Sequence, residues 1–539
     1  RADGLIMADE QNGNGGNGYL SSAWSFGASL VNTVSDTINR YVYCDAQCLH
    51  RGTSHRVHPK TDPSAGGNGA SPLPYAHPFT HRRSSYVVTR HSSLTHRNNA
   101  SCPYQRSFMG YEDLNVIDPT TGKPIKASEQ ADMNDQRAKA FTDYKKYLGK
   151  DITSLVILPV WIMQPFTMLQ NMAEIMEYTD SLDKAAVTED PYKRMAHVVA
   201  YTMGPFAAVE RAWKPFNPIL GETFELHKGD KGIKYIAEQV SHHPPIGASH
   251  AENDLWEYDL VSAPKTKFLG NSVEVYPIGR TRIKLKGTGD EFTLIPPPTK
   301  AHNVIIGKTW IDTCGEYKLI NTVTGAKVTI EFTECGWFSA GRYEIRGHVY
   351  DPEGTPKLLL EGKWNSHLDC TQCDEEGNAL PDAEPERLWT CKPKPENDPY
   401  QFTEFAHLLN SIETCDGVDP LPSDSRRRPD RALLELGRSG EAAVAKHSLE
   451  EMQRAEKKRR EAEDDPWKPR WFHVLPKDAH VHDGEPDNSA CPQFQFNGEY
   501  LKLTARGDVS SAEDVQGEGF NPWQYEEMHE TITIKTADA

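Results

Sequence analysis

The spacing of apolar residues divides the middle of the chain into a helical part and a part made of strands. Up to Gly221, apolar side chains recur every three or four positions, which is the period of one helix face. Ordinary packing against a core accounts for these faces. They comprise Met168, Leu169, Met172, Ile175 and Met176, and then Met195, Val198, Val199, Thr202, Phe206 and Val209.

After Gly221 the period changes to two, which predicts strands. Ile283 and Leu285 alternate with basic residues, and the run 326–332 alternates in the same way. Many strands in succession, with no helices between them, predict a large antiparallel sheet or barrel. Because helical patterns precede the strands and another covers about 441–463, the chain is expected to have an α+β fold.

Both ends of the chain differ in composition from this middle part. Residues 1–135 are rich in Gly, Asn, Ser and His and poor in aliphatic clusters, which predicts a mostly disordered region. Within it, 21–42 has apolar residues at helical spacing and predicts an amphipathic helix suited to a membrane interface, although a local helix without that role fits equally well. The chain starts at Arg1 rather than Met, so a longer protein is expected, and 506–539 form an acidic polar tail.

Charge and cysteine usage narrow the class of protein. The 539 residues include 59 Lys and Arg against 77 Asp and Glu, which gives a net charge of −18. This argues against a nucleic-acid partner, because phosphate binding needs a cationic excess. The most apolar stretch, 155–163, is too short to span a membrane. Ten scattered cysteines are typical of reduced thiols, so a cytoplasmic location is expected.

Two segments carry the candidate chemistry. Segment 214–224 has the sequence Lys-Pro-Phe-Asn-Pro-Ile-Leu-Gly-Glu-Thr-Phe, and 238–245 has Glu-Gln-Val-Ser-His-His-Pro-Pro. Because proline restricts the backbone beside His242 and His243, both imidazoles are held as donors that a nearby phosphate would keep protonated. A structural histidine pair at a rigid turn is the alternative. No metal is expected, because Glu238 stands four residues before His242, unlike the His-Glu-x-x-His arrangement.

A third candidate is the spacing of Lys446, Glu450 and Arg454. They follow at intervals of four, so a helix would present them on one face, although a solvated face with alternating charge explains the same spacing. Cys370 and Cys373 form a lone Cys-x-x-Cys, so zinc is not expected there. We find no Gly-rich phosphate loop, nucleophile elbow or convincing carboxylate pair, and therefore expect neither catalysis nor a cofactor.

Segments 214–224 and 238–245 together resemble the fingerprints of the oxysterol-binding protein-related family of lipid-transfer proteins, and the arrangement resembles that of its short plant-type members. The resemblance covers about 137–505. It implies one lipid-binding domain, with an antiparallel β-barrel around a lipid tunnel, an N-terminal lid, helical layers and a C-terminal helical subdomain. The lid corresponds here to about 137–155, where four residues give a helix an apolar face, and static core packing is the alternative for them. They are Phe141, Tyr144, Tyr147 and Leu148.

The resemblance also implies a phosphoinositide head-group site at the mouth of the tunnel. Arginine offers a planar fork for phosphate, lysine a point charge, and glutamate an acceptor for ring hydroxyls. The overall negative charge does not forbid such a site, because screening limits the reach of each charge to roughly 8–10 Å. His242, His243 and Arg454 would hold the 4-phosphate, and Lys214, Asn217, Lys446 and Glu450 would lie at the inositol ring.

The function implied by the resemblance is lipid exchange. A neutral lipid, taken to be a sterol, would be exchanged for phosphatidylinositol 4-phosphate during peripheral contact with membranes, including contact sites of the endoplasmic reticulum. Phosphatidylserine replaces the sterol in some relatives. Two other classes stay open, namely a phosphoinositide or sterol sensor without net transport and a lipid hydrolase that uses the paired histidines. The sequence specifies no protein partner.

Overall fold

The described part of the chain lies within one of its two compact units, 97–539. From the amino-terminal region it includes two short paired strands, β1 (Ile117–Asp118) and β2 (Lys123–Pro124). The helix predicted over 21–42, the remainder of 1–135 and the tail 506–539 lie outside the described residues. The computed structural model describes residues 117–118, 123–124, 148–150, 160–304, 308–395, 398–411, 420–476 and 491–505.

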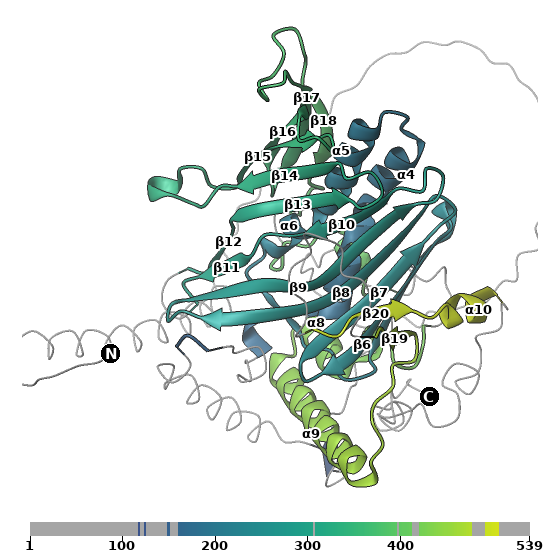
Figure 1. The fold of residues 1–539 in the computed structure, drawn as a ribbon. Coiled ribbons are helices and arrows are strands. Elements are labelled where there is room, and N and C mark those ends of the chain that lie inside the picture. Colours follow the sequence, from purple (N-terminus) through teal and green to yellow (C-terminus); the bar gives the residue numbers. More distant parts are fainter. Residues whose placement is uncertain are drawn as a thin grey trace, which may run out of the picture. The chain divides into compact units, whose positions relative to one another are not determined.

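A 14-stranded antiparallel sheet forms the framework (Figure 1). Its main path runs from β5 to β10 and then from β13 to β18, while β11 pairs with β9 and β12 beside this path. The predicted α+β class with a large antiparallel sheet is therefore confirmed. The strands are β5 (Thr223–Lys228), β6 (Ile233–His242), β7 (Pro245–Glu252), β8 (Trp256–Phe268), β9 (Ser272–Leu285), β10 (Glu291–Ile295), β11 (Thr299–His302), β12 (Trp310–Thr313), β13 (Gly315–Asn321), β14 (Lys327–Phe332), β15 (Glu344–Tyr350), β16 (Pro356–Lys363), β17 (His367–Gln372) and β18 (Glu386–Thr390).

The alternation found in the sequence orients these strands. In β14, Val328, Ile330 and Phe332 are buried, while the intervening side chains reach solvent or half-buried positions. Val328 lies opposite Leu319 of β13 on one side and Val349 of β15 on the other, and all three are buried. One face of the sheet is thus continuously apolar, which fixes the register because a shift by one residue would expose this face.

Hydrogen bonds do not close the sheet into a barrel. Among the described residues no pairing joins β5 to β18, the two ends of the main path. The outer edge of β5 is occupied instead by a distant segment, since Thr223 forms a parallel bridge with Asp424 and its N–H donates to the carbonyl of Ser423 at 2.9 Å. The edge that a closed barrel would pair with β18 is therefore already covered.

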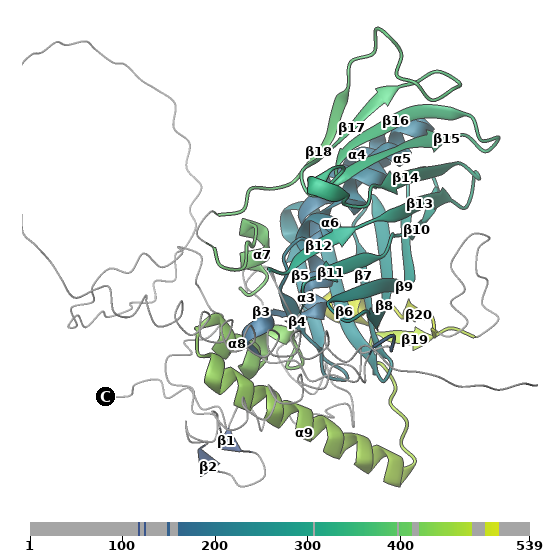
Figure 2. The same ribbon diagram turned by 90° about the vertical axis from the view of Figure 1, so that its left-hand side faces the viewer.

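Short helices from the part before the strands pack against the apolar face of the sheet and share one core with it (Figure 2). The two predicted apolar stripes are each divided. Asp190 caps α5 through bonds from the N–H groups of Tyr192 and Lys193, and α6 starts anew at Gly204, which packs against the ring of Tyr178. These elements are η3 (Val160–Ile162), β3 (Met163–Thr167), α3 (Met168–Ala173), η4 (Glu174–Tyr178), α4 (Thr179–Val187), α5 (Pro191–Thr202), α6 (Gly204–Val209) and β4 (Lys214–Phe216).

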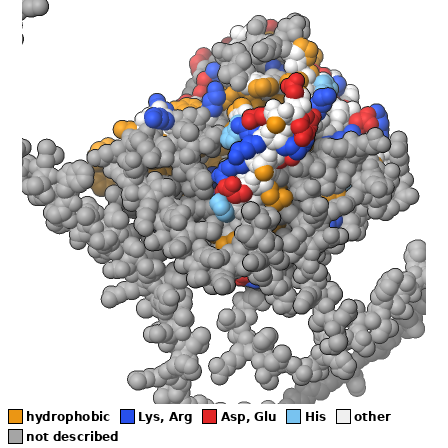
Figure 3. Space-filling model, turned by 90° about the horizontal axis from the view of Figure 1, so that it is seen from below, with side chains coloured by type: hydrophobic (Ala, Val, Ile, Leu, Met, Phe, Trp, Pro, Cys, Tyr) orange, Lys and Arg blue, Asp and Glu red, His pale blue; other side chains and the backbone are white. Residues whose placement is uncertain are grey.

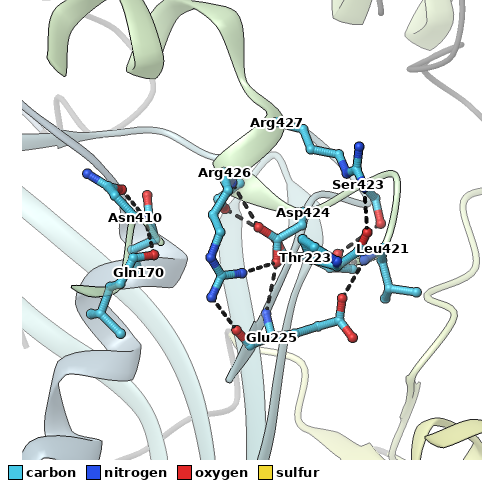
Figure 4. A network of polar contacts seen from close by, with 12 residues as sticks. Gln170, Thr223, Glu225, Asn410, Leu421, Ser423, Asp424, Arg426 and Arg427 are labelled. Atoms are coloured by element: carbon cyan, nitrogen blue, oxygen red, sulfur yellow. Dashed lines mark hydrogen bonds and ion pairs between the residues drawn. The ribbon is translucent and has the colours of Figure 1, made fainter. Parts of the chain in front are cut away.

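The segment after the sheet is held by a buried polar network (Figure 4). Arg426 is fully buried, and it donates to Asp424 Oδ2 at 2.8 Å and to the carbonyl of Glu225 at 2.7 Å. Asp424 Oδ2 in turn accepts from the N–H of Glu225 at 3.0 Å. Each buried charge thus has a partner, which is the condition under which such burial is tolerated.

The helix predicted near the end of the domain is present as α9 (Ser439–Glu463), which runs along the lower side of the molecule in Figures 1 and 2. No helix among the described residues is long and apolar enough to cross a membrane. The remaining elements are α7 (Glu404–Leu408), η8 (Ser425–Arg427), α8 (Pro429–Glu435), β19 (Phe472–Val474), β20 (Phe494–Phe496) and α10 (Glu499–Ala505).

Candidate functional site

The segment 214–224 begins on β4 and forms a tight turn before β5. Lys214 Nζ donates to Asn217 Oδ1 at 2.7 Å and to the carbonyl of Pro215 at 3.1 Å. The turn is closed by Glu222, whose Oε2 accepts from the N–H of Ile219 at 2.9 Å. The lysine ammonium group is therefore held by neutral oxygens within its own segment.

Arg428, at the start of α8, fixes this turn from outside. Its Nη1 donates to the carbonyl of Asn217 at 2.8 Å and to Glu222 Oε2 at 2.9 Å. Asp430 holds the same guanidinium through Oδ1 at 3.0 Å and Oδ2 at 2.6 Å. Arg428 was not among the predicted site residues, although the run of three arginines at 426–428 before Pro429 and Asp430 was a visible signal.

The histidine pair lies at the turn between β6 and β7. The rings of His242 and His243 are 4.6 Å apart between centroids and are inclined at 72°. His242 is partly buried and its Nδ1 has no hydrogen-bond partner among the described residues, while His243 is exposed. The turn is fixed by Ser241, whose hydroxyl donates to the carbonyl of Pro244 at 2.7 Å. The pair therefore offers one buried and one exposed imidazole.

Glu238, the first residue of the same octapeptide, has a different task. It is buried, and its two carboxylate oxygens accept from the N–H groups of Arg470 at 2.8 Å and Trp471 at 2.9 Å. Burial raises the pKa of Glu238 to about 7, against these hydrogen bonds. This glutamate fastens the segment after α9 to β6.

Helix α9 presents Lys446, Glu450 and Arg454 along one face. Lys446 is buried and forms an ion pair with Glu450 Oε1. Arg454 Nη2 lies 3.9 Å from Glu450 Oε2, and this arginine also forms an ion pair with Glu451. The side chain of Arg454 is 46% exposed, so the face passes from a buried cation at Lys446 to a solvated one at Arg454.

Electrostatic coupling shows that the three segments are neighbours. Burial lowers the pKa of Lys214 to about 7; Lys446 contributes to this shift, and Glu450 opposes it. Burial also lowers the pKa of His242 to about 4; His243 contributes, and Glu450 again opposes the shift. Glu450 of α9 thus lies near both Lys214 of β4 and His242 at the β6–β7 turn.

A further cation of α9, Lys457, lies near the histidines. Burial is the main cause of the lowered pKa of His243, and the charge of Lys457 is the second cause. The same charge also contributes to the lowered pKa of His242. In the view of Figure 3 from below, basic side chains and histidines lie close together along the surface of α9, with acidic side chains between them. Cations thus gather near the histidines, together with the acidic partners of α9, on a chain whose net charge is −18.

Of the predicted lid, about 137–155, the structure describes only 148–150. Phe141, Tyr144 and Tyr147 lie outside the described residues. Leu148 is 59% exposed, and the two residues after it pair with the end of β8 through the backbone of Phe268, at 2.7 Å and 3.1 Å. A capping role for these four residues stays a prediction.

No group of three or more His, Cys, Asp or Glu side chains in the described part of the chain could hold a metal ion. Cys370 is buried and Cys373 is half-buried, and both are free thiols. Burial raises the pKa of Cys370 to about 12, so this thiol stays protonated at neutral pH.

The site formed by Lys214, the histidine pair and α9 can hold an anion with its cationic and hydrogen-bonding groups.

Comparison with known proteins identifies similar chains. The family described as oxysterol-binding protein matches residues 140–505. Oxysterol-binding protein-related protein 3B of Arabidopsis thaliana is 44% identical over 450 residues, which are 83% of this chain and 96% of that protein. The Osh1 ORD domain in complex with cholesterol matches with a TM-score of 0.60 at 30% identity, over 76% of this chain and 96% of that one. Osh3 ORD in complex with PI(4)P, from Saccharomyces cerevisiae, matches with a TM-score of 0.57 at 28% identity, over 69% of this chain and 93% of that one.

Proposed function

Because this chain belongs to the oxysterol-binding protein family, we propose that it is a lipid-transfer protein that exchanges a sterol for phosphatidylinositol 4-phosphate between membranes. The family resemblance inferred from 214–224 and 238–245 is confirmed by these matches. Related domains of known structure bind cholesterol in one case and PI(4)P in another, which supports both cargoes.

The observation that carries the proposal is the gathering of basic groups around Glu450. The pKa of Lys214 is lowered to about 7 and that of His242 to about 4, because burial and neighbouring positive charges disfavour their protonated forms. A phosphorylated head group would reverse this penalty, since an anion favours protonated amine and imidazole. An uncharged ligand gains nothing from the same groups. The cluster therefore distinguishes a charged lipid from a neutral one.

The proposed roles of the side chains are those that the family resemblance implies, and the chemistry of each residue type suits its role. His242, His243 and Arg454 hold the 4-phosphate, while Lys214, Asn217, Lys446 and Glu450 address the inositol ring. Each charge-assisted contact contributes on the order of 1.5–3 kcal/mol. The exposed guanidinium of Arg454 suits a phosphate that enters from solvent, and the buried ammonium of Lys446 suits the deeper ring oxygens.

The neutral cargo follows from hydrophobic burial. A sterol hides roughly 400 Å² of apolar surface, so its passage through water costs about 10 kcal/mol at ~25 cal/mol per Å². A carrier removes most of this cost by enclosing the molecule, which is the role proposed for the tunnel that the family resemblance implies. One cavity that takes either lipid but never both would couple their movement in opposite directions.

The test uses donor liposomes that contain a fluorescent sterol and acceptor liposomes that contain phosphatidylinositol 4-phosphate. The full chain is expected to accelerate sterol movement to the acceptor and phosphoinositide movement to the donor, each more strongly when the other lipid is present. Binding without accelerated transfer would instead establish a sensor. Mass spectrometry of the recovered lipids is expected to show them unchanged, and a cleaved product would establish a hydrolase. Faster transfer of phosphatidylserine than of sterol would reassign the neutral-lipid role.

A further inference from the structure

The connection between β14 and β15 presents two large apolar side chains to solvent. Trp337 is 90% exposed and Phe338 is 102% exposed, the highest fractions among the large apolar side chains of the described residues. The connection contains the short helix η6 (Trp337–Ser339) and projects beyond the ends of β14 and β15, at the left of Figure 1. Neither ring is buried, so neither stabilises the fold through hydrophobic burial, and their exposure calls for another explanation.

The backbone holds this tip in a defined shape. Gly336 and Ala340 are joined by a hydrogen bond of 2.9 Å from N–H to carbonyl, and the N–H of Cys335 donates to Asp312 Oδ2 at 3.0 Å. Phe338 has φ 57° and ψ 31°, a left-handed conformation that is costly for a bulky side chain. The tip is thus a fixed turn whose conformation directs both rings outward, and such backbone strain is a feature of functional sites.

The base of the tip has the composition of a membrane interface. The guanidinium of Arg342 lies 4.9 Å from the ring of Trp310 and 4.6 Å from the ring of Tyr343. Trp310 stacks on His302 at 4.1 Å between centroids. Amphipathic aromatic rings with an adjacent cation are typical of the level of lipid head groups, below which fully apolar rings insert.

We propose that Trp337 and Phe338 insert into the interfacial layer of a lipid bilayer and anchor the protein on the membrane surface. The area of the tip favours this occupant over a protein. Two aromatic side chains bury roughly 300–500 Å² in total, whereas a stable protein interface needs about 800 Å² from each partner. A second copy of the chain would therefore need further apolar surface at the tip. A bilayer accepts a small wedge of this kind.

The inference rests on the proposed function, because a carrier of membrane lipids must meet a bilayer. It adds that contact does not depend on the head-group site. The tip belongs to the β14–β15 connection, whereas the head-group residues come from β4, the β6–β7 turn and α9. Attachment through the tip needs no anionic lipid, since Trp337 and Phe338, the two side chains that insert, are uncharged.

The test is flotation of the full chain with vesicles of phosphatidylcholine alone. Changing Trp337→Ala together with Phe338→Ala is expected to lower the bound fraction about tenfold, whereas Trp337→Leu with Phe338→Leu is expected to preserve it. Val323→Ala is the matched control. Val323 is 62% exposed in the turn between β13 and β14, at the opposite end of β14 and about 20 Å away, and its loss is expected to leave flotation unchanged.

A second measurement separates anchoring from ligand binding. Dioctanoyl phosphatidylinositol 4-phosphate reaches the protein without a bilayer, and the double alanine variant is expected to bind it as the wild type does. Equal flotation of wild type and the double alanine variant would overturn the inference, as would absence of wild-type flotation. Sedimentation that shows a wild-type dimer, dissociated by the double alanine change, would assign the tip to a second copy instead. Wild-type flotation without dioctanoyl-lipid binding would refute the proposed function and leave the anchor standing.

Discussion

Arg428 and Asn217, separated by 211 positions, are joined by a hydrogen bond of 2.8 Å from the guanidinium to the backbone carbonyl. This contact connects α8 to the turn that carries Lys214. Arg428 is buried and also neutralises the buried carboxylates of Glu222 and Asp430. The position of the turn, and therefore of the head-group lysine, depends on a charge that does not itself belong to the proposed ligand set.

Arg428→Gln is expected to destabilise the protein by about 3–5 kcal/mol, because it leaves two buried carboxylates without their cation. Urea unfolding followed by circular dichroism measures the change. Arg387→Gln is the matched control, since Arg387 pairs with Asp369 on the surface and its removal is expected to have a much smaller effect. Similar midpoints for both variants would show that the Arg428 network does not hold the fold.

Phosphoinositide affinity is expected to rise as the pH falls from 8 to 7. The pKa of Lys214 in the empty site is about 7, lowered by burial, so the protonated fraction rises from about one-tenth to one-half over this range, and Lys214 alone raises the association constant about fivefold. Titration with dioctanoyl phosphatidylinositol 4-phosphate measures this. Sterol affinity is expected to stay constant.

The matched variant for this pH dependence is Lys214→Arg, because arginine stays charged throughout the range. Its affinity is expected to change less between pH 8 and pH 7 than that of the wild type. Equal slopes for the two proteins would mean that another group, and not Lys214, gains the proton on binding.

Glu450→Gln is expected to weaken phosphoinositide binding about tenfold, because the change removes a charged acceptor for ring hydroxyls and the partner that positions Lys446. Glu451→Gln is the control. Glu451 is the next residue of α9, pairs with the exposed Arg454, and is 49% exposed, so its change is expected to alter affinity less than about twofold. Equal losses in the two variants would point to a general effect of helix charge rather than to a contact with the ligand.

The features that follow from local periodicity were predictable. The alternation over 326–332 gave the buried face of β14, and apolar spacing placed α9 within two residues of its start. Spacing also put Lys446, Glu450 and Arg454 on one face of that helix. Each of these inferences needs only the period of a helix or a strand, which neighbouring residues determine.

The features that depend on distant contacts were not predictable in the same way. The expected large antiparallel sheet is present, but whether hydrogen bonds close it could not be read from periodicity; among the described residues they do not, because the segment around Asp424 occupies the edge of β5. No pattern near Asp424 in the sequence indicates that its backbone pairs with Thr223. Glu238 illustrates the same point within a recognised motif, since it binds the backbone at Arg470 and Trp471 rather than facing the histidines' ligand site. These contacts join segments that are far apart in the sequence, and the arrangement of such segments was inferred only from the family resemblance.

The central claim is that basic side chains at one site distinguish a phosphorylated lipid from a neutral one, and the double change His242→Ala with His243→Ala tests it most directly. Extraction of phosphatidylinositol 4-phosphate and of sterol from liposomes is measured for this variant, with His473→Ala, an exposed histidine of β19, as the control. The account predicts that phosphoinositide extraction falls at least about tenfold while sterol extraction and the control stay at the wild-type level. Equal loss of both lipids, or unchanged phosphoinositide extraction, would contradict it.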